Sequence, residues 1–326
     1  MGTLLFLLMT MMPQSTSEYP HPEFIVKTYP ETVMPGDTLY FTVVAKNPHR
    51  ESIFLTEYLL FEGDIQFHLT DLENQTQRLF FEGPPIYAQR VRRYSEIKPG
   101  STQIICAVAI NVPPLEDLKE PFWKEHLRNL SANDTKFTFS VIIGSLVATN
   151  EMGANGVGKS FTFEIPIVMK QRPANEMALI QKWLEDTPKE FLPAPFHGLP
   201  KVPPLDSQMS FAIFKNILVK GDLLPQTNFM RASNRYPGYP NAPDTWQGWK
   251  ALEDSLSPST MRDEIRMARI LIQYSGTEDD AVLEELKEWF ANMNEVQRSV
   301  LIKFTYNKGK AYEAIKEYDI SAPNVP

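Results

Sequence analysis

The sequence has little cysteine, no late apolar run and no concentration of one charge. Cys106 is the single cysteine among 326 residues, so no disulfide can form within the chain and a small disulfide-stapled scaffold is excluded. No segment after the N-terminal region is long and apolar enough to span a bilayer as a helix. The net charge is −8 without a basic block, which argues against a nucleic-acid partner.

Recognisable patterns for metal binding and catalysis are also missing. No two of the five histidines stand at a spacing typical of metal ligands, and neither H-E-x-x-H nor G-x-S-x-G occurs. We therefore expect no metal ion and no other cofactor, and no residue is assigned a catalytic role. The sequence favours a non-enzymatic protein. A hydrolase whose residues are too scattered to form a motif remains the alternative.

One stretch does match a nucleotide-binding pattern. "GANGVGKS", residues 153–160, fits G-x-x-x-x-G-K-[ST], which cradles phosphates when a strand precedes it and a helix follows it. After Ser160 apolar and polar residues alternate, which is typical of a strand, and Pro166 would interrupt a helix. We interpret the stretch as a hairpin connection between strands. The less favoured alternative is nucleotide binding through Gly153, Gly158, Lys159 and Ser160.

The N-terminus resembles an export signal. The apolar run from Leu4 to Met12 is too short to cross a bilayer but has the length of a signal-peptide hydrophobic region. Ser15 and Ser17 are small residues suited to a cleavage site after Ser17. Because no Lys or Arg precedes the run, a buried N-terminal strand or helix is the alternative. We expect residues 1–17 to be a signal peptide and the mature chain to be periplasmic or secreted.

The first half of the chain has the pattern of an antiparallel β-sandwich. Between Glu23 and Met169 about eight segments alternate apolar and polar residues and are separated by turn residues. Two Pro-Gly turns, at Pro35–Gly36 and Pro99–Gly100, each precede an apolar strand. We expect residues 18–172 to form this sandwich, with a helical insertion near 115–131.

Residues 23–170 resemble the immunoglobulin-like modules of exported bacterial proteins. The resemblance lies in "PGDTLYFTVVAKN", where a turn precedes a strand that ends in Asn, and in the second Pro-Gly turn ahead of another strand. It implies an immunoglobulin-like fold and an extracytoplasmic location, and it implies no activity. The missing disulfide agrees with a bacterial rather than an animal origin for such a module.

From residue 173 onward, apolar residues recur at spacings of three and four, which predicts helices. Six prolines between Pro188 and Pro204 predict a semi-rigid connection. Gly276 is expected to end one helix and Thr277 to cap the next. We expect residues 173–326 to form an α-helical domain, either a bundle or a short solenoid, and no repeat of fixed period is present.

The best candidate for a ligand site in the sequence is the aromatic stretch "NRYPGYPNAPDTWQGW". Aromatic side chains in a loop can stack on sugar rings or cover a peptide groove, although large aromatics are more often buried for packing. We predict ligand binding by Tyr236, Tyr239, Trp246 and Trp249. The function that follows is an exported binding or scaffolding protein whose partner is a protein or a glycan, of undetermined oligomeric state.

Overall fold

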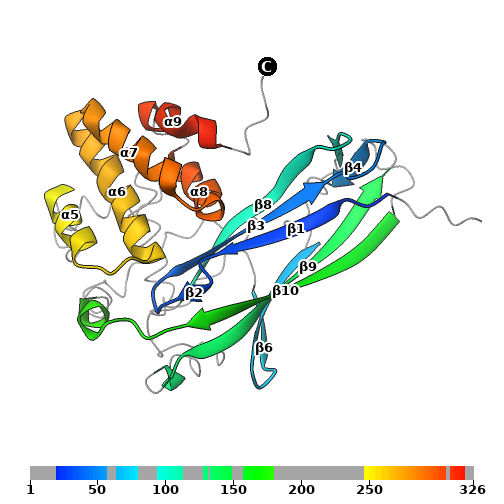
Figure 1. Cartoon of the computed structure of the whole chain (residues 1–326), viewed down its shortest axis with the longest axis horizontal. Coiled ribbons are helices and arrows are strands. Elements are labelled where there is room, and N and C mark those ends of the chain that lie inside the picture. The colour runs from blue at the N-terminus through cyan, green and yellow to red at the C-terminus, as the bar shows by residue number, and fades with distance from the viewer. Residues whose placement is uncertain are drawn as a thin grey trace, which may run out of the picture.

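The structure combines mostly antiparallel β-sheets in the N-terminal part with helices toward the C-terminus (Figure 1). It is a computed structural model that describes residues 20–56, 64–79, 94–112, 128–130, 133–148, 157–179, 246–305 and 309–319. The expected proline-rich connection at 188–204 lies outside these residues. Most of the helical insertion expected near 115–131 also lies outside them, and only Arg128 and Asn129 are described there as helical.

The first sheet has three antiparallel strands in the order β1-β3-β8. They are β1 (Glu23–Tyr29), β3 (Thr38–Lys46) and β8 (Thr102–Asn111). β3 is the central strand, and it pairs along its whole length with β8 and from Tyr40 to Lys46 with β1. The apolar–polar alternation of "TLYFTVVAK" therefore predicts a strand correctly, but its polar positions do not face water, as described below.

The second sheet has the order β2-β10-β9-β4-β7, and β5 also pairs with β9 and with β6. Its strands are β2 (Thr32–Val33), β10 (Val157–Met169), β9 (Thr135–Ala148), β4 (Ile53–Thr56), β7 (Tyr94–Ile97), β5 (Ile65–Asp71) and β6 (Thr76–Leu79). β2 runs parallel to β10, and the other pairs are antiparallel. β2 is too short to produce a recognisable alternation in the sequence.

A hydrophobic core joins the two sheets. Phe41 of β3 lies 4.6 Å from Phe67 and 5.1 Å from Phe139 between ring centroids, and the latter two rings stack at 5.9 Å. All three rings are fully buried. Offset and tilted ring pairs at these distances add favourable contacts to the burial of apolar surface. The odd-numbered residues of β3 thus connect the sheets.

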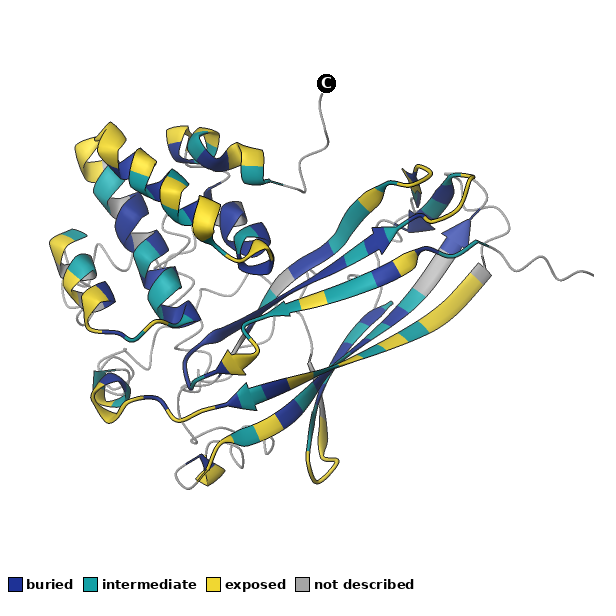
Figure 2. Cartoon of the chain, viewed as in Figure 1, coloured by how far each residue is buried: buried dark blue, intermediate teal, exposed yellow. Residues whose placement is uncertain are grey.

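The other face of β3 is covered by helices. These are α5 (Trp246–Asp254), α6 (Thr260–Thr277), α7 (Asp280–Asn292), α8 (Glu295–Leu301) and α9 (Lys310–Ile315), with 3-10 turns at Ile302–Thr305 and Lys316–Tyr318. Tyr40 and Ala107 belong to the same buried cluster as the apolar faces of α6, α7 and α8. Figure 2 shows β3 buried along most of its length between the helices and the second sheet.

The ends of α6 and α7 differ from the sequence-based prediction. Thr277 is the last residue of α6, and the cap of α7 is Asp279, whose carboxylate accepts a hydrogen bond from the Ala281 N–H. α6 passes through Gly276 and ends at Glu278, which has φ 51° and donates its N–H to Tyr274 O. The prediction was wrong by two residues, because the backbone of Glu278 adopts the left-handed conformation expected of Gly276 and the side chain of Asp279 is the cap expected of Thr277.

Candidate functional site

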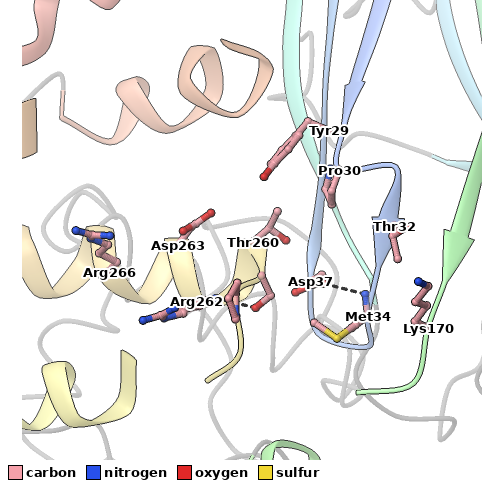
Figure 3. A pocket seen from close by; sticks show the side chains of 12 residues that line it. Tyr29, Pro30, Thr32, Met34, Asp37, Lys170, Thr260, Arg262, Asp263 and Arg266 are labelled. Atoms are coloured by element: carbon pink, nitrogen blue, oxygen red, sulfur yellow. Dashed lines mark hydrogen bonds between the residues drawn. The ribbon is translucent and has the colours of Figure 1, made fainter. Parts of the chain in front are cut away.

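A hollow of about 370 Å³ lies where the β-sheets meet the start of α6. Residues near the ends of β1 and β2 and the turn before β3 form one wall, and the first two turns of α6 form the other. Figure 3 shows the side chains of Tyr29 and Lys170 on the strand side and of Arg262, Asp263 and Arg266 on α6. The lining is mostly polar and charged, and Pro30, Met34 and Pro258 are its apolar residues.

The path of the chain between β1 and β2 explains how the strand wall of the hollow forms. β1 pairs with β3 in the first sheet, whereas β2, only two residues farther along the chain, pairs with β10 in the second sheet. The chain therefore changes sheets between Tyr29 and Thr32, and the side chains at this crossing are turned toward the space in front of α6. Met34 and Pro30 supply apolar surface to the hollow.

The helix side is positioned by the cap of α6. Ser259 has an extended backbone, and its hydroxyl accepts a hydrogen bond from the Arg262 N–H. Thr260 Oγ1 accepts a hydrogen bond from the Thr38 N–H of β3 at 2.8 Å. The first turn of α6 is therefore bonded directly to the central strand of the first sheet, which fixes the distance between the two walls.

A buried ionic cluster stabilises the contact between the first sheet and the start of α6, which we call the joint. The Arg172 side chain is fully buried, and its guanidinium donates to Asp37 Oδ1 at 2.6 Å, to Glu176 Oε2 at 2.7 Å and to Pro35 O at 2.6 Å. Asp37 Oδ2 also accepts from the Met34 N–H at 2.8 Å. Nearly every donor and acceptor of the cluster is satisfied, as a buried charge requires.

Glu176 extends the cluster to the helices. Its Oε1 accepts hydrogen bonds from both the N–H and the hydroxyl of Ser257, just before α6. Burial alone raises the pKa of Glu176, but the bonds from Ser257 and Arg172 outweigh it, and its pKa is lowered. The carboxylate therefore stays ionised and links residues 172–176, the turn before β3 and the segment ahead of α6.

Two titratable groups of the hollow have shifted pKa values. Burial raises the pKa of Asp263 despite a hydrogen bond from Gln297 and the nearby charge of Arg266. Burial and the charges of Asp263 and Asp37 raise the pKa of Tyr29. Raised pKa values in a concave site are typical of functional residues, although structural clusters can produce them too. The charge of Asp263 acts on Tyr29, and both side chains line the hollow.

The basic residues of the hollow differ in whether carboxylates neutralise their positive charge. Arg266 lies 3.7 Å from Glu253 and 3.4 Å from Glu285, and its guanidinium stacks 5.2 Å from the Trp289 ring centroid. Arg262 donates its Nε–H to the Glu253 carbonyl, a neutral partner. Lys170 is exposed, and within the described part of the chain no carboxylate pairs with its ammonium group. Among the described residues, Arg262 likewise has no carboxylate within ion-pair distance.

The aromatic stretch predicted from the sequence is only partly described. Tyr236 and Tyr239 lie outside the described residues. Trp246 is the first residue of α5 and is half-buried, and the side chain of Trp249, also in α5, is outside the described set. Of the four residues, only Trp246 has a described side chain, and it is not among the described residues that line the hollow.

The structure describes only the C-terminal end of the nucleotide-binding pattern. Gly158, Lys159 and Ser160 lie in β10 and pair with β9, while Gly153 lies outside the described residues. The residues after Lys159 continue as a strand to Met169, where a phosphate-binding loop requires a helix. Lys159 extends over the Phe161 ring at 5.5 Å. The expected strand after the motif is confirmed.

Sequence reasoning missed the hollow because its residues are far apart in the chain. They come from positions 29–37, 170 and 258–266. Within the described residues no group of three or more His, Cys, Asp or Glu is arranged to hold a metal ion. In the same part of the chain, no helix has the length and apolar character needed to cross a membrane.

No family model and no curated protein matches the chain. Among solved structures, the ApaA protein of Bordetella pertussis has 14% identity and a TM-score of 0.24, covering 45% of this chain and 90% of its own. The PapD-like domain 7 of human CEP192 has 8% identity and a TM-score of 0.21, covering 52% and 99%. The Escherichia coli alpha-2-macroglobulin, from domain MG7 onward, has 10% identity and a TM-score of 0.25, covering 92% and 55%. At these TM-scores the likenesses identify neither a fold nor a particular protein.

Proposed function

We propose that this chain is an extracytoplasmic binding or scaffolding protein and that the hollow between the sheets and α6 is its ligand site. The supporting observation is that side chains from both parts of the fold line one space of about 370 Å³. This space contains Asp263, Tyr29 and Lys170, none of which is needed for the ionic cluster around Arg172. A protein or glycan ligand with hydroxyl or carboxylate groups fits this mixture of polar side chains.

The finer fold assignment belongs to the same proposal. We infer an immunoglobulin-like sandwich over residues 18–172 and a helical domain over 173–326, with the sandwich as the rigid platform. Two mostly antiparallel sheets that pack on one buried core support this, because that is the architecture of such sandwiches. The joint is suited to hold a ligand because the Arg172 cluster and the bond from Thr38 to Thr260 keep its walls together.

The test is binding of defined oligosaccharides and synthetic peptides to the purified chain, measured by calorimetry. The variants are Lys170→Met and Tyr29→Phe, and the control is Lys287→Met, which removes an exposed lysine of α7 away from the hollow. We expect the pocket variants to weaken binding at least about tenfold, a loss near 1.4 kcal/mol, and the control to leave it unchanged. A ligand that binds both pocket variants like the wild type is held elsewhere, and absence of binding to either class rejects the proposed function.

Location is tested separately by fractionating the native cell and sequencing the N-terminus of the mature chain. Cleavage after Ser17 predicts a mature chain that begins at Glu18 in the exported fraction. An intact Met1 in the cytosol would refute export and would leave the binding proposal to be judged on the hollow alone.

A further inference from the structure

Among the residues that the structure describes, β10 forms an open edge of the second sheet along most of its length (Figure 1). β9 pairs with all thirteen of its residues, whereas β2 pairs on the opposite side only at Val168 and Met169. Ahead of that short contact, the even-numbered residues are exposed: Gly158, Ser160, Thr162, Glu164 and Pro166. Open edges are able to pair with another strand, and most proteins shield them.

The register shows which backbone groups face the open side. The Gly144 N–H of β9 donates to Asp64 O at the end of β5, away from β10. Ser160 stands opposite Gly144, so its own N–H and C=O face away from β9. The same orientation recurs at every second residue of an antiparallel ladder. The bonds from Val168 N–H to Glu31 O and from Lys170 N–H to Val33 O, both on the β2 side, agree with it.

Pro166 fits this geometry and ends the run of N–H groups that face the open side. As an even-numbered residue, it directs its nitrogen, which carries no hydrogen, toward the open side, so the ladder with β9 loses no bond. Between Gly158 and Pro166 the open edge offers N–H groups at Gly158, Ser160, Thr162 and Glu164. This pairing window is symmetric about Thr162, with Gly158 and Pro166 at its two ends.

We propose that the pairing window, residues 158–166, is an interface that joins two copies of this chain through antiparallel β10 strands. With the two-fold axis at Thr162, Ser160 of each copy stands opposite Glu164 of the other. Each N–H of the window then has an acceptor, because the Gly158 N–H meets the C=O of Pro166. A two-fold interface of this kind is self-complementary and closes after two copies, so it does not propagate into fibres.

The side chains favour a second copy as the occupant. On the outer face Thr162 meets its own equivalent and Glu164 meets Ser160, so no like charges stand directly opposite each other. On the inner face Phe161 meets Phe163, and both are only half-buried in the single chain. Pairing would place these aromatic rings side by side and remove more of their surface from water. Lys159 meets the apolar Ile165 rather than another cation.

Thr162→Pro tests the interface without touching the ladder within the chain. The substitution removes an N–H that faces the open side, as the native Pro166 already does. We expect the full-length wild type to dimerise in sedimentation velocity between about 1 and 200 µM, and Thr162→Pro to raise the dissociation constant at least about tenfold. Thr162→Val keeps the N–H and a similar shape, and it should dimerise like the wild type.

Thr162→Lys is the second variant, in case the proline perturbs folding. It places two ammonium groups face to face at the two-fold axis, so dimerisation should weaken at low salt and recover at high salt. Circular dichroism and the melting temperature verify that each variant is folded. A wild type that stays monomeric across the whole range, or a folded Thr162→Pro chain that dimerises like the wild type, overturns the proposal.

Discussion

Arg172 is the residue on which the joint between the sheets and α6 depends most. Its guanidinium is fully buried and contacts Asp37 and Glu176, and neither carboxylate is exposed by more than a few per cent. A buried ion pair adds little net stability compared with an apolar replacement of all partners, but removal of one partner leaves uncompensated charge. Nothing in the sequence around "KQRPANE" distinguishes this arginine from an ordinary surface residue.

Arg172→Met is expected to lower the free energy of unfolding by about 3–5 kcal/mol, because two buried carboxylates lose their counter-charge. Urea titration measures the change. Lys316→Met, which breaks the exposed pair with Glu313, is the control and should cost less than about 1 kcal/mol. Equal small losses for both variants would show that water reaches the cluster and compensates Asp37 and Glu176.

The raised pKa of Asp263 predicts that its contribution to folding stability falls as the pH rises, whereas that of an ordinary paired carboxylate increases. Burial raises its pKa above the usual 3.8, so the folded chain holds the proton more tightly than the unfolded chain does. The stability that this proton provides is complete below pH 3.8 and is lost as the pH rises through the raised value. The carboxylate at neutral pH therefore opposes folding.

Asp263→Asn should accordingly be more stable than the wild type at pH 7, and the difference should disappear as the pH falls below 3.8. Denaturant titrations at several pH values measure it. Asp254→Asn is the matched control with the opposite sign, because a hydrogen bond from Lys250 lowers the pKa of Asp254. A wild type more stable than Asp263→Asn at pH 7 would contradict the assignment. A gain in stability here is typical of residues retained for function.

At the scale of the elements, α6 is the helix that defines the hollow. Its N-terminus is fixed by the Ser259 hydroxyl and by the contact between Thr260 and β3. The sequence predicts the helix well, since apolar residues recur at helical spacing from Met261 to Leu271. It does not predict the contact with β3, because Thr38 is more than two hundred residues away.

Ser259→Ala should lower the free energy of unfolding by about 1 kcal/mol, because the Arg262 N–H loses its acceptor. Thermal and urea unfolding measure the loss. Ser259→Asn retains a side-chain oxygen at the cap and should restore most of the stability. If the asparagine is no better than the alanine, the cap contributes through something other than this hydrogen bond.

The whole molecule is held together by β3, which is buried on both faces. Phe41 belongs to the core between the sheets, whereas its neighbour Tyr40 belongs to the core beneath the helices and donates to Glu264 Oε1 at 2.8 Å. Burial and the charge of Glu264 raise the pKa of Tyr40 well above its usual value, so the hydroxyl remains a donor. Loss of either core therefore exposes one face of the same strand.

We expect a single cooperative unfolding transition for the sheets and the helices together, because neither core can be lost without the other. The helix signal in circular dichroism and the β-sheet signal in infrared spectroscopy should give coincident midpoints. Arg172→Met should shift both midpoints by the same amount. Two separate transitions, with the helices melting first, would show that the contacts of α6 and α8 with β3 are too weak to couple the two parts.

Local patterns determined the strands, the helices and the rejection of a helix after Lys159, because alternation and spacing are properties of neighbouring residues. They failed at the end of α6, where Glu278 and Asp279 replace the expected Gly276 and Thr277. Alternation along β3 also predicts that its polar positions face water, whereas the structure buries Thr38 and Tyr40 under helices. A single-strand pattern cannot tell a solvated face from a face covered by distant residues.

Only the tertiary structure decided which groups meet at the joint and which edge stays open. Arg172, Asp37 and Glu176 are charged and would be placed on the surface by sequence alone, yet packing brings them together away from water. The outward direction of the Thr162 N–H depends on its pairing partner in β9, a quantity absent from the sequence of β10. Strand and helix character are local in the chain, whereas burial, charge pairing and edge geometry arise from contacts between segments far apart in it.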